Sequence, residues 1–380
     1  MKNVAIVTTT INVPTFLSDL SENAMKYDKS NLKFYIIGDK KTPVECIEYC
    51  KSLNNKFPYD YEYLGIVDQE KKLSNYPDLL KIIPYNSGVR KLLGNLIAYI
   101  DGADVVIQID DDNFILNDDF IGAHCKVDTI SEIELFESNN GWFNVYLPLV
   151  EENNIPFFPR GYPWSKRDYH NEIKINSHKK KAKIVTINGL VYEDPDIDAI
   201  SRLFWPIRVV DIDKKFLGNY GLNPGTWCSF NNQNTSTSRE LTEVFFTPPS
   251  GGRNSDIWTS FVICKLVENF DDIIAYGSPM VKQIRNPHNL WIDLEDELIS
   301  NKATEKFVEI LRSIEDLNCK TYTDALKELM KKSLIKLKSL TDLPFDEHEM
   351  MKKYFEEYII WNDIFVQLNK LDSSNECNIV

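Results

Sequence analysis

The segment VVIQIDDDNFIL, residues 105–116, decides the fold that we expect for this chain. A nearly continuous run of β-branched and other apolar residues ends directly in three aspartates, Asp110, Asp111 and Asp112. Strands that are covered on both faces of a sheet have this apolar character. Because three adjacent carboxylates repel one another, we expect a positively charged partner at the end of this buried strand.

Two further segments share this apolar character, VAIVTTT at 4–10 and LKFYIIGD at 32–39, and the strand before the aspartates extends over 103–110. Helical patterns lie between these strands, around residues 14–27, 42–53 and 86–100. Alternating strands and helices predict an α/β fold whose sheet is built with right-handed crossovers.

Polar residues stand at the carboxyl ends of these strands, where ligands of α/β sheets bind. Thr9, Thr10 and Asn12 follow the first strand, Asp39 ends the second, and the three aspartates end the third. We therefore expect one crevice lined by all three strand ends. The alternative for the first two groups is that they are turn residues satisfying local backbone groups.

Size and composition indicate a globular chain. Its 380 residues are 43% hydrophobic, enough to bury a substantial core. The net charge of -14 argues against a nucleic-acid partner, since phosphate contacts need a cationic face. We expect no transmembrane segment, because no run of eighteen apolar residues occurs. Seven scattered cysteines without a disulfide framework predict a cytoplasmic protein.

The remainder of the chain divides into an irregular and a helical part. Residues 140–260 are rich in proline and aromatic residues, which is typical of functional loops. From about residue 300 the pattern is helical with charged outer faces. We expect a catalytic domain over 1–298, a helical subdomain over 299–372 and a flexible tail over 373–380. The amphipathic C-terminal helices would suit a homo-oligomer or contact with a membrane surface.

The three aspartates predict a divalent metal site. Mn²⁺ and Mg²⁺ prefer oxygen ligands, and carboxylates at a strand end commonly hold them against a diphosphate. Alternate residues of an extended segment face the same side. Asp110 and Asp112 are thus expected to bind the metal together, while Asp111 points elsewhere. A solvated acidic turn is the alternative.

A strand followed by an acidic motif resembles the nucleotide-sugar glycosyltransferases of the GT-A fold. Three further segments resemble one family in particular, the reversibly glycosylated polypeptides, which include the UDP-arabinopyranose mutases. They are NSGVRKLLGNLIAYIDGADVVIQIDDDNF around the acidic motif, RGYPWSKR at 160–167 and GGRNSDIW at 251–258. GLVYEDPDIDAISRL, at 189–203, resembles the family's linking segment, so that the resemblance runs from about residue 4 to 295.

The resemblance implies a Rossmann-like GT-A fold, a mixed sheet flanked by helices, here with a helical C-terminal extension. It implies that Arg160 matches the arginine that becomes glycosylated and that Arg90 matches a basic residue before the metal strand. Asp256 matches an acidic residue on the acceptor side, where a general base acts in inverting enzymes. N-capping of a helix is the alternative for Asp256.

Other residues are candidates for the same site. The GT-A resemblance implies that Thr9, Thr10, Asn12 and Asp39 contact the nucleotide together with Asp111, and that His288 completes the metal shell. Arginines bind phosphate oxygens well, although each of them has a surface ion pair as its alternative. The arginine candidates are Arg90, Arg160, Arg167, Arg253 and Arg285. Four tryptophans are candidates for stacking on a sugar or for the core: Trp164, Trp205, Trp227 and Trp258.

The leading hypothesis is therefore a metal-dependent glycosyltransferase that transfers sugar from a nucleotide diphosphate donor, with UDP expected, to a carbohydrate acceptor. One alternative is a UDP-sugar mutase or a self-glycosylating protein that acts through Arg160. Another is a non-catalytic scaffold whose C-terminal helices dock a partner.

Overall fold

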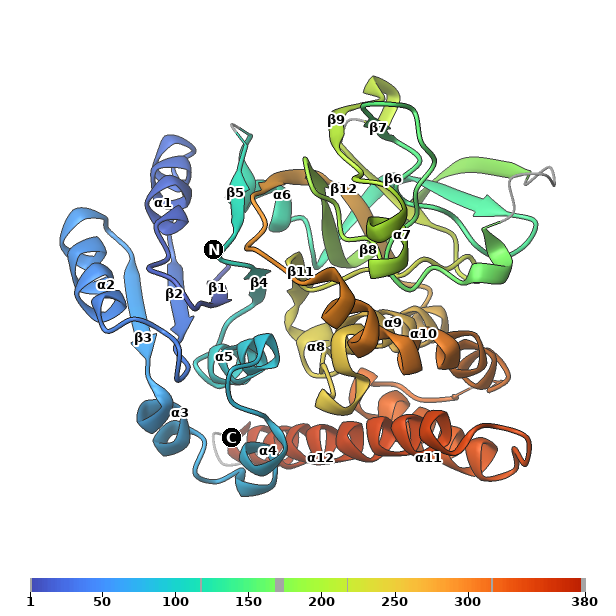
Figure 1. Ribbon diagram of the computed structural model, residues 1–380. Coiled ribbons are helices and arrows are strands. Elements are labelled where there is room, and N and C mark those ends of the chain that lie inside the picture. Colours follow the sequence, from blue (N-terminus) through green and yellow to red (C-terminus); the bar gives the residue numbers. More distant parts are fainter. Residues whose placement is uncertain (1, 117, 168–173, 217, 316, 377–380) are drawn as a thin grey trace.

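The computed structural model describes residues 2–116, 118–167, 174–216, 218–315 and 317–376. Its centre is a ten-stranded mixed sheet with helices packed against it, and the C-terminal part of the chain is helical (Figure 1). The structure thus confirms the mixed α/β sheet flanked by helices and the helical C-terminal part that the sequence predicts.

The N-terminal part of the sheet is parallel. Its strands are β1 (Val4–Thr9), β2 (Leu32–Ile37), β3 (Asp60–Leu64) and β4 (Val105–Ile109), in the spatial order β3-β2-β1-β4. The three predicted strands are present and end one or two residues earlier than expected. The sequence does not predict β3, because DYEYL lacks the continuous apolar character of the other three.

Five helices accompany these strands: α1 (Phe16–Lys26), α2 (Glu45–Lys56), α3 (Ile66–Lys72), α4 (Pro77–Ile82) and α5 (Lys91–Ile100). A 3₁₀ turn at Gly88–Arg90 leads directly into α5. Val4 and Ile6 of β1 belong to the core cluster that includes α1 and α2, whereas Ala5 and Val7 belong to the cluster that includes α5. Alternation along β1 therefore places helices on both faces of the sheet.

Helix α5 approaches the sheet closely at Gly94. A Cβ atom at this position would lie 2.5 Å from Cγ1 of Val7 and 2.8 Å from the side chain of Ile37. Any residue with a Cβ atom would therefore require the side chains of Val7 and Ile37 to shift. The N-terminal end of α5 is thereby held beside the carboxyl ends of β1 and β2.

The second part of the sheet is mixed. It contains β5 (Asn113–Ile115), β6 (Thr129–Ser138), β8 (Ile175–Tyr192), β10 (Asn219–Leu222), β11 (Asn234–Ser238) and β12 (Ile273–Gln283). The order continues from β4 as β11-β8-β6-β10-β12-β5, and β12 also pairs with β8. The strands β8, β6, β10 and β12 therefore form a closed cycle of pairings. Beside this sheet lie a two-stranded sheet, β7 (Leu149–Glu151) and β9 (Val209–Ile212), and the short helices α6 (Phe120–His124), α7 (Ala199–Phe204) and α8 (Arg239–Thr242).

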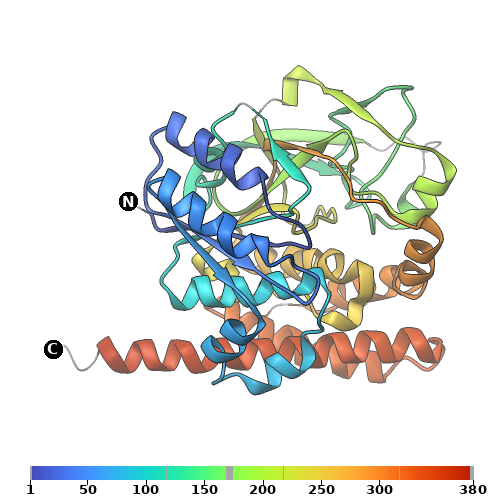
Figure 2. The same ribbon diagram turned by 60° about the vertical axis from the view of Figure 1, so that its left-hand side comes forward.

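Four longer helices complete the fold: α9 (Ser255–Phe270), α10 (Leu290–Arg312), α11 (Tyr322–Lys338) and α12 (Phe345–Glu376). Helices α11 and α12 run along one side of the molecule, below α5, α8 and α9 in both views (Figures 1 and 2). The helical part expected from about residue 300 begins earlier, at Leu290 of α10. Helix α12 extends to Glu376, past the expected start of the tail at residue 373, and residues 377–380 lie outside the described residues, so that the tail stays a prediction.

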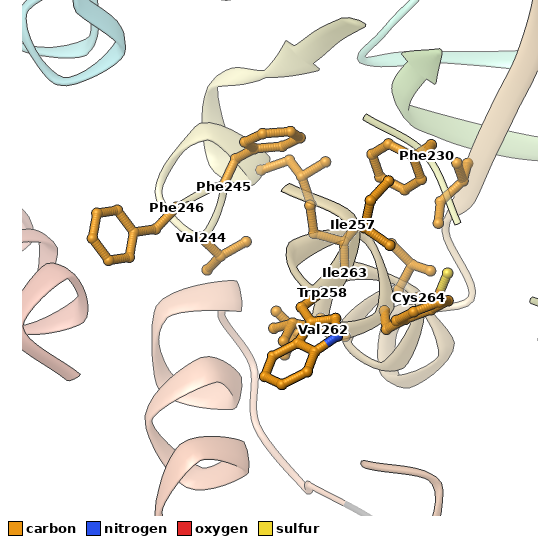
Figure 3. Packing of buried hydrophobic residues seen from close by; sticks show 14 of the residues in the cluster. Phe230, Val244, Phe245, Phe246, Ile257, Trp258, Val262, Ile263 and Cys264 are labelled. Carbon is orange, nitrogen blue, oxygen red and sulfur yellow. The ribbon is translucent and has the colours of Figure 1, made fainter. Parts of the chain in front are cut away.

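The C-terminal helices share a hydrophobic core with the rest of the chain. Trp258 of α9 stacks on Phe307 of α10 with ring centroids 4.3 Å apart, and Phe246 stacks on Trp361 of α12 at 4.8 Å. Figure 3 shows Trp258 and Phe246 among the buried side chains of this cluster. The boundary at residue 298 stays a prediction, but the packing on its two sides is continuous.

None of the helices in the described ranges combines the length and the apolar character that crossing a membrane requires.

We predict that the C-terminal helices unfold together with the sheet. Trp361 is fully buried, and its indole Nε1 donates to the Glu243 carbonyl at 2.8 Å. The change Trp361→Ala should lower the free energy of unfolding by about 3–5 kcal/mol. Chemical denaturation followed by fluorescence and circular dichroism should show one transition.

The matched control is Phe345→Ala, because Phe345 lies on the same helix and is 77% exposed. Its effect should stay within about 0.5 kcal/mol. Two separate transitions, of which only one responds to Trp361→Ala, would show that residues 299–372 fold as an independent unit.

Candidate functional site

A cavity of about 810 Å³ collects most of the charged residues that the sequence analysis selected. It lies between the end of β4, the start of α5, the 247–256 segment and the residues that follow β12. Seven predicted site residues line it: Asp110, Asp112, Arg160, Arg253, Asp256, Arg285 and His288. The cavity lies at the carboxyl end of the third predicted strand and includes Ile11 after the first, but Asp39 at the end of the second does not line it, so the three strand ends do not all contribute as expected.

The three aspartates point in different directions. Asp110 and Asp112 line the cavity. Asp111 turns away and accepts hydrogen bonds from Thr10 Oγ1 at 2.6 Å and from Asn12 Nδ2 at 3.3 Å. Asp111 is thus separated from its neighbours as expected, but a turn in which the Asn113 N–H donates to the Asp110 carbonyl at 3.2 Å produces the separation, rather than an extended segment.

Asp112 carries an unsatisfied carboxylate oxygen. Its Oδ2 accepts a hydrogen bond from Gln283 Nε2 at 3.0 Å, whereas its buried Oδ1 has no hydrogen-bond partner among the described residues. Burial, together with the nearby charge of Asp110, raises the pKa of Asp112 to about 6. An ionised carboxylate in this position costs stability unless a cation binds it.

Asp110 is paired with Lys91, the first residue of α5. The Lys91 ammonium contacts Asp110 Oδ1 and also donates to the Asn232 carbonyl at 3.0 Å. Arg90, and not Lys91, was the basic residue expected at this site. Successive helical residues differ in direction by about 100°, so sequence alone does not show which of two adjacent bases faces the site.

The oxygen donors of Asp110 and Asp112 fit a hard divalent cation, and the unpartnered Oδ1 of Asp112 supports this assignment. Within the described residues, no group of three or more His, Cys, Asp or Glu side chains is arranged to hold a metal. His288 lines the cavity, but its Nδ1 lies 3.3 Å from Asp293 Oδ2. Asp110 and Asp112 would thus hold a cation together with oxygens from a ligand or water, as is common for Mg²⁺.

A buried ion cluster also lines the cavity. Arg160 donates from Nε and Nη2 to Asp196 at 2.9–3.1 Å, and its Nη2 lies 3.3 Å from both carboxylate oxygens of Asp256. Although burial alone would raise the pKa of Asp196, the Arg160 guanidinium lowers it to about 2. The two carboxylates raise the pKa of Arg160 further above its usual value, despite its burial.

Asp256 lies farther from the Arg160 guanidinium than Asp196 does, with Nη2 distances of 3.3 Å and 2.9 Å. It is the second residue of α9, whose N-cap is Asn254, so the capping alternative is not what the structure shows. Burial raises the pKa of Asp256. The Arg160 guanidinium lowers it, but the charges of Asp196 and Asp110 raise it, and the net shift is upward. A carboxylate with a raised pKa at a cavity wall has the character of a proton acceptor.

The remaining basic residues of the cavity are also paired. Arg253 contacts Asp293 at 3.0 Å and Glu297 at 3.2 Å, both on α10. Arg285 donates to Asp194 at 2.8 Å. Arg167 does not line the cavity, because it pairs with Asp198 at 2.8 Å and covers the Trp164 ring.

Six residues predicted to bind the nucleotide do not line the cavity: Thr9, Thr10, Asn12, Asp39, Arg90 and Asp111. Thr9 Oγ1 donates to the Ile37 carbonyl at 2.8 Å and so joins β1 to β2. Asp39 accepts the backbone N–H of Ser87 at 3.2 Å, and Arg90 lies beside it, bound to Gln69. These residues hold the backbone next to Ile11 and Ser87, which do line the cavity. Direct contact with a nucleotide stays a prediction for them.

The structure also separates the four tryptophans. Trp227 and Trp258 are buried in the core, while Trp164 and Trp205 are exposed, and none of the four lines the cavity. The lining residues that the sequence analysis missed include Lys91, Asp196, Thr247, Gln283 and Asp296. Asp196 lies within the GLVYEDPDIDAISRL segment, and the resemblance of that segment could have indicated Asp196 as a site residue.

No protein-family model matches the chain, and no curated protein matches it significantly. Among solved structures, the chain is similar to the mannosyltransferase PcManGT from Pyrobaculum calidifontis in complex with GDP-Man and Mn²⁺. The identity is 11%, the match covers 95% of this chain and 86% of that chain, and the TM-score is 0.39. A likeness at this level carries no argument about activity.

We predict that Asp112→Asn stabilises the ligand-free protein. The carboxylate of Asp112 has a folded-state pKa of about 6, above the usual value of 3.8, so its ionisation favours unfolding. This penalty is absent below about pH 4 and fully present above about pH 7. At pH 7.5 the variant should gain about 1–3 kcal/mol in the free energy of unfolding, and at pH 4 it should gain nothing.

The control is Asp111→Asn, which makes the same substitution one residue away. Asp111 accepts two hydrogen bonds and should lose rather than gain stability. Chemical denaturation at both pH values measures the difference, and a gain at pH 7.5 that is equal for both variants would contradict the assignment to Asp112.

Proposed function

We propose that this protein is a metal-dependent glycosyltransferase of the GT-A type, which transfers a sugar from a nucleotide diphosphate donor, UDP being expected, to a carbohydrate acceptor. One observation carries the proposal. Asp110 and Asp112 line the same cavity as Asp256. Two carboxylates suited to bind a cation and one suited to accept a proton therefore lie in one cavity. Glycosyl transfer needs both of them.

The donor side of the cavity comprises the strand-end carboxylates and nearby bases. A divalent cation bound to Asp110 and Asp112 would neutralise the charge that develops on the departing diphosphate. Arg285, beside Gln283, is positioned to add a phosphate contact. Ile11, Pro84 and Ser87 line the neighbouring wall, where we place the nucleoside.

The acceptor side comprises Asp256 and the cluster that orients it. An acceptor hydroxyl attacks the anomeric carbon, the bond from that carbon to the diphosphate oxygen breaks, and the hydroxyl proton passes to the Asp256 carboxylate. Arg160 holds Asp256 in place through its Nη2, while Asp196 holds Arg160. Both Arg160 and Asp196 thus act as positioning residues for the proton acceptor.

The contacts of Arg160 do not favour the alternative in which this residue carries the sugar. Its guanidinium is buried, contacts two carboxylates and also donates to the Arg253 carbonyl. These contacts keep it charged, and a charged guanidinium is a poor nucleophile. The contact between Arg160 and Asp256 nevertheless joins the RGYPWSKR and GGRNSDIW segments, which supports a common site for the two segments that resemble the reversibly glycosylated polypeptides.

We predict that UDP together with Mn²⁺ raises the melting temperature of the wild-type protein, because a ligand of the folded state stabilises it. At a concentration of about 100 times Kd the gain is about 2.7 kcal/mol. The double variant Asp110→Asn, Asp112→Asn should lose this shift and all sugar transfer. If no nucleotide shifts the wild-type protein, the scaffold hypothesis is favoured instead.

We predict that Asp256→Asn lowers kcat by about 10²–10⁴-fold and leaves the UDP–Mn²⁺ shift intact, because the change removes the proton acceptor but not the donor site. The control is Asp296→Asn, at an exposed acidic residue that also lines the cavity. Steady-state transfer assays measure kcat. An Asp256→Asn enzyme with a kcat within a few-fold of wild type would exclude this residue as the base.

A further inference from the structure

Lys91 has an unusual position for a lysine. Its side chain is only 2% exposed, it lines the cavity, and its ammonium is held by Asp110 and the Asn232 carbonyl. Among the described residues, Asp110 is the only carboxylate in ion-pair contact with it. A buried ammonium is costly unless it is paired and hydrogen-bonded, so the Asp110 contact is needed in the ligand-free protein.

The backbone around Lys91 adds positive potential. Lys91 stands in the first turn of the helical segment that begins at Gly88 and continues as α5. The N-terminal end of a helix carries partial positive charge, which disfavours a lysine and favours an anion. Gly88 and Val89 line the cavity beside Lys91. The single charge of Asp110 therefore faces both an ammonium and a helix N-terminus.

The fold fixes Lys91 at this place. The close contact of Gly94 with Val7 and Ile37 holds α5 against the sheet. Residues three apart on a helix share a face, so Lys91 faces the sheet side, where the chain leaves β4 at Asp110. The ammonium lines the cavity, so groups that enter the cavity can supply alternative acceptors for it.

A cation bound to Asp110 and Asp112 would compete directly with Lys91 for Asp110. Two positive charges would then share one carboxylate in a partly buried space, and their repulsion is stronger there than in water. The lysine stem is flexible, and its three donors can be redirected. A diphosphate entering with the cation supplies the anionic acceptor that Lys91 would otherwise lose.

We propose that Lys91 is a diphosphate-binding residue that moves from Asp110 to the donor's phosphate oxygens when a divalent cation occupies the aspartates. The inference rests on the proposed function and deepens it. In the absence of donor, Lys91 pairs with Asp110. The cation takes Asp110 from Lys91, and the diphosphate gives Lys91 a new anionic partner. Each ligand therefore raises the affinity for the other. The cation alone binds weakly, since it has to displace the ammonium.

The test is the Lys91→Gln variant, titrated by calorimetry first with Mn²⁺ alone and then with UDP in the presence of saturating Mn²⁺. Removal of the ammonium should raise the Mn²⁺ affinity, since the cation no longer has to displace it. UDP affinity should fall by at least about tenfold, because one charge-assisted contact is lost. These opposite directions separate a phosphate ligand from a residue that only organises Asp110, whose loss would weaken both.

Lys40→Gln is the matched control. Lys40 is exposed, lies over the Tyr85 ring at 3.8 Å and does not line the cavity, so the same charge change there should alter neither affinity. Melting temperatures establish that each variant folds. Lys91→Met, which keeps the apolar stem, replaces Lys91→Gln if the latter does not fold.

Inorganic pyrophosphate is titrated beside UDP so that the two proposals fail separately. Two outcomes in the Lys91 variant would overturn the role of Lys91 without affecting the proposed function. One is unchanged affinity for UDP and pyrophosphate, and the other is a loss of Mn²⁺ affinity as large as the loss of UDP affinity. A wild-type protein that binds pyrophosphate but not UDP would contradict the nucleotide donor and leave the role of Lys91 measurable. Failure of the wild-type protein to bind either ligand with Mn²⁺ would overturn both.

Discussion

The cavity depends on the buried contact of Arg160 with Asp196 and Asp256. This cluster joins three segments that are far apart in the sequence, since Arg160 is 36 residues from Asp196 and 96 residues from Asp256. Removing one partner of a buried ion pair leaves an uncompensated charge and typically costs about 3–5 kcal/mol. The same contacts that hold the wall together also set the different proton affinities of its two carboxylates. Asp196 is held ionised, whereas Asp256 is left as the more basic group.

Helix α12 contacts the 247–256 segment, which carries Asp256. Glu357 of α12 accepts hydrogen bonds from Ser250 N at 3.0 Å and from Ser250 Oγ at 2.7 Å, and the Tyr354 hydroxyl donates to the Ser255 carbonyl at 2.9 Å. Between these two serines lies Gly252, whose φ of +58° only glycine adopts readily there, because its ψ is -137°. Contacts with α12 thus fix the 247–256 segment at Ser250 and at Ser255. A helical part that the sequence sets apart by composition is in this way connected to the cavity through the loop that carries Arg253 and Asp256.

Local patterns in the sequence predicted those features of the fold that local physics determines. Continuous apolar runs located β1, β2 and β4, whereas the different direction of Asp111 arises from a turn after β4 and not from the alternation that was expected. Non-local pairings were beyond reach, since the cycle of β8, β6, β10 and β12 depends on contacts between distant segments. The choice between Arg90 and Lys91 was also beyond reach, because it depends on how α5 is rotated against the sheet. Tryptophans could not be divided into core and surface by residue type alone.

The charges of the cavity suit a ligand that brings both signs at once. Its described lining includes five aspartates and four lysine or arginine residues, so the ionised groups nearly balance: Asp110, Asp112, Asp196, Asp256 and Asp296 against Lys91, Arg160, Arg253 and Arg285. A dication alone would repel Lys91, and a diphosphate alone would repel Asp110 and Asp112. Together they add little net charge, and each meets a group of opposite sign that is already present. The imperfect pairing of Asp112 in the ligand-free state then has a physical reason, because a carboxylate without a partner at one oxygen costs stability but leaves that oxygen available for a cation.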